Sequence, residues 1–168
     1  MNPPSILLAA IASVLLAGCH SGNTLRLAAE SAATAPAECG PVSVTSSSLR
    51  GRDGYFFIRT DLVFSGLDRD APASGVRFRS ASYESDVLTF KPAGVGVLPY
   101  NSEAPFDSTV TVPSGRFYVV SEPEQTGSAV ADHSRWKTIR LVVEWTQPQR
   151  SVGDCRSTFL LAADPYFD

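Results

Sequence analysis

The chain has 168 residues and a formal net charge of −3. This mildly acidic balance excludes the strong basic field that nucleic-acid binding requires, so we expect no nucleic-acid partner. Once the export signal described below is removed, about 150 residues remain, which is the usual size of a single domain.

Residues 1–18 have the features of a signal peptide. Residues 6–17 form an apolar run that is as long as the hydrophobic region of such a peptide. The run is too short for a membrane-spanning helix, which needs roughly 20 residues. It ends in the order Leu16, Ala17, Gly18 and Cys19, with small residues directly before the cysteine. We therefore assign residues 1–18 to a signal peptide that is removed on export.

Residues 16–19 resemble the lipobox of bacterial lipoproteins in both order and position. The resemblance implies that the chain is cut before Cys19 and that lipid is attached to this residue, leaving the mature protein anchored to a membrane. In Gram-negative members of the family an Asp after the cysteine favours the inner membrane, and this chain has His20 instead. The expected location is the cell envelope, at the outer membrane, facing the periplasm or the cell surface. The alternative is an ordinary cysteine that ends a cleaved or buried helix.

The other two cysteines are Cys39 and Cys155. If Cys19 carries lipid, as the resemblance implies, these two remain in a compartment that oxidises thiols, and we expect them to form a disulfide. The alternative is two separate free or buried thiols. A disulfide would close a loop of roughly 115 residues, worth on the order of 5 kcal/mol in the chain-entropy model.

Residues 20–38 are small and polar, are rich in Ala and Ser, and lack the alternation of a strand. This composition predicts that residues 19–38 are a lipidated N-terminus followed by a flexible tether. Such a tether would let the domain float roughly 25 Å from the bilayer. Residues 39–168 are then the single folded domain.

From Cys39 onward the sequence has a period of two and is interrupted by Gly, Pro, Ser and Asp, which predicts many short strands. The expected strands are residues 42–48, 55–65, 76–82, 87–90, 108–112, 116–121, 136–146 and 155–162. In the expected strands of residues 55–65 and 136–146, apolar and polar residues alternate, which indicates that one face of each strand is buried. The expected core residues are Phe56, Ile58, Leu62, Phe64, Ile139, Leu141, Val143 and Trp145.

Eight short strands without a βαβ rhythm predict an all-β fold. We expect an antiparallel β-sandwich of immunoglobulin-like shape, with a small β-barrel as the alternative. A true immunoglobulin domain is not expected, because Cys39 and Cys155 are too far apart in the sequence for its intersheet disulfide.

The sequence lacks a motif typical of catalysis. The two histidines are His20, beside the anchor, and His133, in a polar loop, so neither a catalytic triad nor a zinc site is expected. Asp68 and Asp70 raise the alternative of a calcium site, although Asp is also an ordinary turn residue. Paired carboxylates for glycoside hydrolysis depend on distances in space, and the sequence leaves them open. We predict no catalytic residue, no cofactor and no metal.

The segment of residues 90–107 is the longest irregular stretch and is rich in proline and aromatic residues. Long loops on a rigid β scaffold often carry function, so this segment is the expected partner site. Tyr55 and Phe57, and Tyr166 and Phe167 in the tail, are further candidate anchors for an interaction. We predict a non-enzymatic envelope lipoprotein that presents its domain to a protein partner or an envelope assembly. The alternative is a ligand-binding or hydrolytic lipoprotein acting on glycan, lipid or metal.

Overall fold

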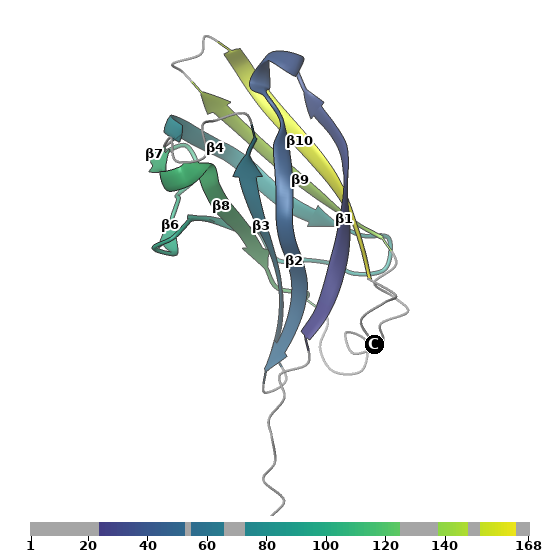
Figure 1. The fold of residues 1–168 in the computed structure, drawn as a ribbon. Coiled ribbons are helices and arrows are strands. Elements are labelled where there is room, and N and C mark those ends of the chain that lie inside the picture. Colours follow the sequence, from purple (N-terminus) through teal and green to yellow (C-terminus); the bar gives the residue numbers. More distant parts are fainter. Residues whose placement is uncertain (1–23, 53–54, 66–72, 125–137, 148–151, 164–168) are drawn as a thin grey trace, which may run out of the picture.

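A computed structural model describes residues 24–52, 55–65, 73–124, 138–147 and 152–163 of the chain. These residues form ten β-strands and two short 3-10 helices (Figure 1). The strands are β1 (Thr24–Ala35), β2 (Val42–Arg52), β3 (Tyr55–Phe64), β4 (Ala73–Glu84), β5 (Gly94–Val97), β6 (Ser102–Glu103), β7 (Thr109–Val112), β8 (Arg116–Ser121), β9 (Ile139–Gln147) and β10 (Val152–Ala163). The 3-10 helices are η1 (Ala37–Cys39) and η2 (Pro113–Gly115).

The described strands pair in the order β6-β5-β8-β3-β2-β1-β10-β9-β4-β7, and each pairing is antiparallel. They form one continuous sheet that curls around its own core (Figure 1). The prediction of an all-β antiparallel fold is therefore confirmed. Two separate sheets, as in a sandwich, are not confirmed, and the curled sheet is consistent with the barrel-like alternative.

Strand β1 corrects the prediction of a flexible tether. Residues 24–35 are a strand rather than a tether: residues 24–26 pair with β2, and residues 27–35 pair with β10. The sequence hides this strand because Ala and Ser are poor strand formers, and only Leu27 is buried among residues 26–30. Its backbone is instead held in place by partners far along the chain.

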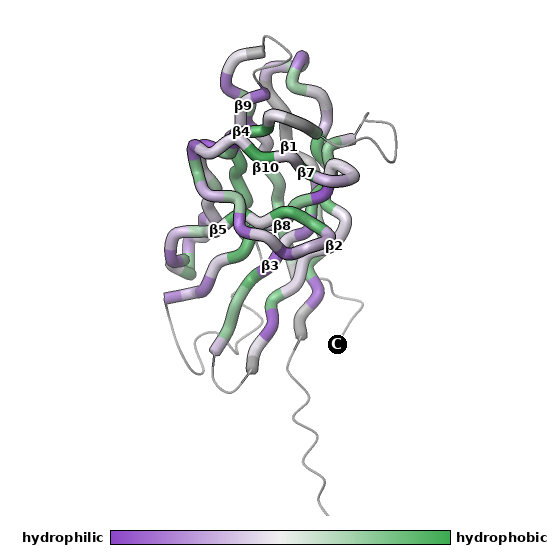
Figure 2. Tube along the Cα trace, turned by 90° about the vertical axis from the view of Figure 1, so that its left-hand side faces the viewer, coloured by the Kyte–Doolittle hydropathy of each residue, from purple (hydrophilic) through white to green (hydrophobic). Residues whose placement is uncertain are grey.

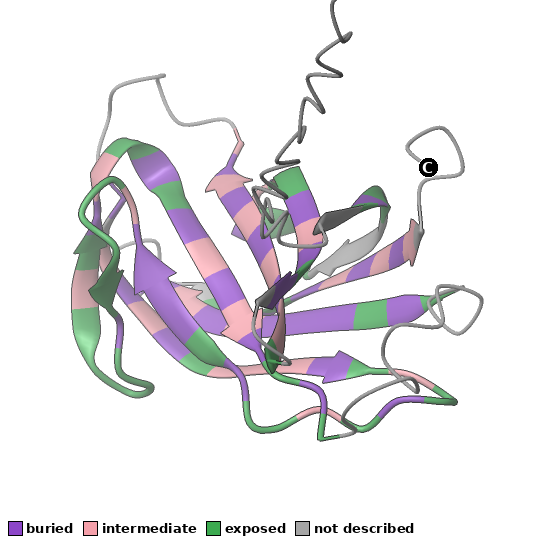
Figure 3. Cartoon of the chain, turned by 90° about the horizontal axis from the view of Figure 1, so that it is seen from below, coloured by how far each residue is buried: buried purple, intermediate pink, exposed green. Residues whose placement is uncertain are grey.

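The core lies inside the curl of the sheet. Figure 3 shows buried bands alternating with less buried ones along the strands, and Figure 2 shows hydrophobic stretches on β8 and β10. Most of the predicted core residues are almost completely buried, and Phe56 is half-buried against them. Aromatic rings meet here, some from paired strands such as β3 and β8 and some from strands far apart in the sheet order. The ring centroids are 4.9 Å apart for Phe64 and Phe117, 5.0 Å for Phe78 and Phe117, and 5.7 Å for Phe64 and Trp145.

Two of the predicted segments differ from the structure. Residues 87–90 are not a strand: Val87 is exposed, and Phe90 forms an isolated bridge to Pro123. Residues 90–107, predicted to be irregular, contain strands β5 and β6. In β5 the alternation is between valine and glycine, so Val95 and Val97 reach the core while the other side of the strand carries no side chain.

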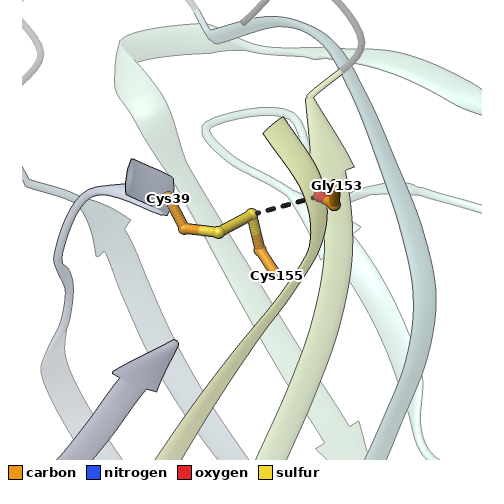
Figure 4. The surroundings of a disulfide bond; sticks show 3 residues. All are labelled: Cys39, Gly153 and Cys155. Atoms are coloured by element: carbon orange, nitrogen blue, oxygen red, sulfur yellow. Dashed lines mark hydrogen bonds between the residues drawn. A yellow bond between two sulfur atoms is a disulfide. The ribbon is translucent and has the colours of Figure 1, made fainter. Parts of the chain in front are cut away.

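Cys39 and Cys155 form a disulfide, in agreement with the predicted pairing, and their Cα atoms are 5.8 Å apart (Figure 4). Cys39 lies in η1 and Cys155 lies in β10, and both residues are buried. The disulfide therefore ties the connection between β1 and β2 to the strand with which β1 already pairs.

Removing the disulfide between Cys39 and Cys155 should lower the stability of the protein strongly. Replacing both cysteines, as Cys39→Ala with Cys155→Ala, should lower the free energy of unfolding by about 2–5 kcal/mol, because the unfolded chain then loses a cross-link between distant residues. Denaturant unfolding checks this value, and chemical reduction of the unmodified protein should give a similar loss. A double variant that unfolds at the same denaturant concentration as the oxidised protein would contradict the prediction.

A polar cluster lies inside the core. The hydroxyl of Tyr83 donates a hydrogen bond to the carbonyl oxygen of Val119 at 2.9 Å and lies 3.0 Å from Oγ1 of Thr60. Thr60 in turn lies 2.8 Å from Oγ of Ser47. The cluster joins β4 to β8, β3 and β2 through buried groups, which are costly to leave without a partner. Burial raises the pKa of the Tyr83 phenol above its ordinary value, because it penalises the charged form.

We expect Tyr83→Phe to lower the free energy of unfolding by about 1–3 kcal/mol, because it leaves buried oxygen atoms without their partner. The raised pKa of Tyr83 also predicts a pH effect. Its contribution to stability is complete below the ordinary tyrosine pKa of about 10 and is lost as the pH rises further. The variant and the unmodified protein should therefore differ in stability at neutral pH, and this difference should shrink as the pH rises above about 10. Tyr100→Phe, at an exposed residue, is the control and should change neither quantity.

Candidate functional site

The side of the sheet that points away from the core carries a continuous set of polar, aromatic and glycine residues together with one valine. We call this surface the outer face. Its residues are Ser46, Ser48 and Arg50 of β2, Phe57, Arg59 and Asp61 of β3, Tyr118 and Val120 of β8, and Gly94 and Gly96 of β5. Strand register places them in rows across the four strands. The alternation that buries Ile58 and Phe117 directs their sequence neighbours to this face.

Arg59 is held by its neighbours at the centre of the outer face. Its Nε donates to Oδ1 of Asp61 at 2.8 Å, and its Cζ lies 4.1 Å from the centroid of the Tyr118 ring. Ser46 donates to the other carboxylate oxygen of Asp61 at 3.1 Å. About a quarter of each side chain of the Arg59–Asp61 pair is exposed, so the pair is partly shielded from water. We infer that Arg59 positions Tyr118.

Tyr118 lies across Gly96 on the neighbouring strand. A Cβ atom at Gly96 would come within 2.2 Å of the Tyr118 ring, so only glycine leaves room for the ring in this position. The hydroxyl of Tyr118 also lies 3.4 Å from the carbonyl oxygen of Asn101. The aromatic ring thereby covers a backbone that has no side chain of its own, which is a known way to stabilise glycine in a strand.

Two shallow hollows flank Gly94 and Val120 on the outer face. The first, of about 310 Å³, lies between these residues, Tyr118 and Phe106 of the segment after β6. The second, of about 510 Å³, lies between the same two residues and Phe57. Gly94 borders both hollows, and a Cβ atom there would meet only Val120, at 3.9 Å. The missing side chain at Gly94 thus leaves the space that the hollows share.

An ion pair borders the second hollow. Nζ of Lys91 lies 2.6 Å from Oε2 of Glu122, and about half of each side chain is exposed. This hydrogen bond to Glu122 raises the pKa of Lys91. The backbone N–H of Lys91 donates to the carbonyl oxygen of Glu122 at 2.8 Å, and Oγ of Ser121 donates to the carbonyl oxygen of Lys91 at 2.6 Å. The border of the hollow is therefore fixed by backbone contacts as well as by charge.

Only some of the residues predicted to bind a partner lie in the described part of the chain. Phe57 lines the second hollow, Tyr55 is exposed at the start of β3, and the segment of residues 90–107 borders both hollows. Other predicted residues lie outside the described part of the chain. These are Leu16, Cys19, His20, Asp68, Asp70, His133, Tyr166 and Phe167.

Sequence reasoning did not identify Tyr118 or Val120, and it included Gly94 only as part of the segment of residues 90–107. The alternation of residues 116–121 was a usable signal, because it directs Tyr118 and Val120 away from Phe117 and Val119. No local signal shows that Tyr118 covers a glycine on another strand.

Within the described ranges, no three His, Cys, Asp or Glu side chains are grouped so that they could hold a metal ion. None of the helices described is long and apolar enough to cross a membrane.

Comparison of the chain with protein-family models, with curated proteins and with solved structures gives no match.

The two glycines of β5 provide a matched test of the outer face. Gly96→Ala should lower the free energy of unfolding by about 1–3 kcal/mol, because the added methyl group forces the Tyr118 ring away from its place. Gly94→Ala should be neutral or raise stability by up to about 1 kcal/mol, because Ala is better tolerated than Gly inside a strand and space is available. Denaturant unfolding measures both. Equal effects of the two substitutions would contradict the contact between Tyr118 and Gly96.

Proposed function

We propose that this protein is a lipoprotein of the bacterial cell envelope, anchored through acylated Cys19 in the outer membrane, which binds a protein partner through its outer face. The observation that carries the proposal is the pair of hollows on either side of Gly94. They place apolar and aromatic side chains, among them Phe57, Phe106 and Val120, within reach of a partner. The lipobox resemblance of residues 16–19 supports the anchor.

The composition of the outer face supports a protein partner. Aromatic residues and Arg contribute most of the binding energy in many protein interfaces, and an apolar centre surrounded by polar residues is the usual arrangement. Here Phe57 and Val120 line the second hollow, and the Lys91–Glu122 pair lies at its border. The curled sheet beneath is closely packed, so this surface is already formed before a partner arrives.

The same surface is less suited to a small ligand or to hydrolysis. A small-ligand site is usually a concave pocket that covers most of its ligand and directs a few polar groups inward. The hollows described on the outer face are shallow. Of the charged side chains that line them, Lys91 and Glu122 of the second hollow pair with each other, and the first hollow is lined by a single charged side chain, Glu103. These features favour a protein partner over the ligand-binding or hydrolytic alternative.

The anchor is tested by the intact mass of the protein purified from native membranes. We expect a chain that begins at Cys19 with added mass equal to its acyl groups, and a Cys19→Ala variant that lacks this mass and leaves the membrane fraction. Two or three acyl chains bind a bilayer firmly, at about 0.8 kcal/mol per buried methylene, so the difference between the two proteins should be clear. A chain without lipid, or one that begins elsewhere, would refute the anchor.

The outer face is tested by crosslinking in intact cells followed by capture of the partner. Gly94→Leu should fill the space that the two hollows share and weaken capture by about tenfold or more, which corresponds to at least about 1.4 kcal/mol. Gly153→Leu is the matched control, because Gly153 is also an exposed glycine within a strand and has open space around it. Capture that survives in Gly94→Leu, or that is lost equally in both variants, would remove the assignment to the outer face.

A further inference from the structure

The sheet begins very close to the expected lipid anchor. Thr24, the first residue of β1, follows Cys19 by five positions. A fully extended chain spans at most about 3.3–3.6 Å per residue, so Thr24 lies no more than roughly 18 Å from an acylated Cys19 along the chain. If Cys19 is acylated, β1 therefore cannot move as far from the bilayer as the roughly 25 Å expected for the predicted tether.

The strand register shows which end of the domain faces this anchor. Thr24 pairs with Arg50, and Arg50 pairs with Phe57 of β3. The end of the sheet beside Thr24 is thus the end at which β2 stops and β3 begins, as Figure 1 shows. We call the residues Thr24, Arg50 and Tyr55 the anchor end. The disulfide of Cys39 lies at the other end of β1.

Two side chains of the anchor end, those of Tyr55 and Arg50, suit a lipid headgroup region. Tyr55 is the first residue of β3 and is 76 % exposed. Tyrosine combines an apolar ring with a polar hydroxyl, and it is enriched where membranes meet water. Arg50 is also exposed, and a long arginine side chain can cover apolar surface while its guanidinium group reaches a phosphate.

We propose that the anchor end rests on the lipid headgroups of the membrane that holds Cys19, with the Tyr55 ring in the interface. The inference depends on the lipid anchor of the proposed function. It orients the domain so that its strands rise from the bilayer and the outer face stands to the side. Because Phe57 lines the second hollow and pairs with Arg50, this orientation places that hollow close to the membrane surface.

The chain offers a matched pair of residues for the test. Tyr55 and Tyr100 are both tyrosines, with exposed fractions of 76 % and 78 %. Tyr100 lies far from the anchor end: it follows Val97, which pairs with Phe117, and Phe117 pairs with Leu62. Leu62 is seven residues beyond Tyr55 in β3, which is about 23 Å along a strand.

The experiment uses the full acylated protein in vesicles of phosphatidylethanolamine and phosphatidylglycerol that contain a lipid with a nitroxide on its headgroup. A fluorescent thiol label is attached to Tyr55→Cys or to Tyr100→Cys, while Cys39 and Cys155 remain in their disulfide. We expect the nitroxide to quench the label at residue 55 at least about twofold more than the label at residue 100, because quenching requires the label to be at the headgroups.

The outcomes separate this inference from the proposed function. If intact mass shows the acyl groups and the protein floats with the vesicles, but the two labels are quenched equally or not at all, the orientation is wrong and the anchor stands. If no acyl groups are present, both the anchor and the orientation are refuted. Stronger quenching at residue 100 would indicate that another part of the domain contacts the membrane, and it would also overturn the inference.

Discussion

The structure depends above all on the double pairing of β1. Its first residues pair with β2 and the rest pair with β10, so this strand joins the two halves of the sheet. Without it, β2 and β10 would each present an unpaired edge, and the curl around the core would be open on that side. The disulfide between Cys39 and Cys155 holds the end of β1 against the same partner. A segment with few large apolar side chains thus holds the sheet together through its backbone.

The core and the outer face are two sides of the same strands, so one supports the other. In β8, Phe117 and Val119 are fully buried, and Tyr118 between them points to the outer face. The backbone that carries Tyr118 therefore cannot shift without disturbing the aromatic contacts inside. Arg59 and Gly96 then fix where the Tyr118 ring lies. This arrangement provides a preformed surface, which reduces the entropy that binding must overcome.

The sequence predicted the parts of the fold that depend on local alternation. The buried positions of residues 55–64 and 139–147 followed from a period of two, and the disulfide followed from the cysteine count. The sequence failed where distant partners decide the structure. The sequence of strand β1 shows no alternation of apolar and polar residues, and its pairing with β10 joins residues more than 120 positions apart. The hollows likewise depend on Gly94 and Tyr118, which come together only through the pairing of β5 with β8.

The short distance between Cys19 and β1 also bears on how a partner would bind. A long tether would let the domain sample many heights and orientations, and binding would have to restrict them. With at most roughly 18 Å of chain before Thr24, an acylated protein is confined to a thin layer above the bilayer. A partner in the same membrane would then meet the outer face at a raised effective concentration, while a partner deep in the aqueous space would gain nothing from the anchor. For a protein acylated at Cys19, as we propose, the position of β1 favours a partner that is itself bound to, or embedded in, the membrane.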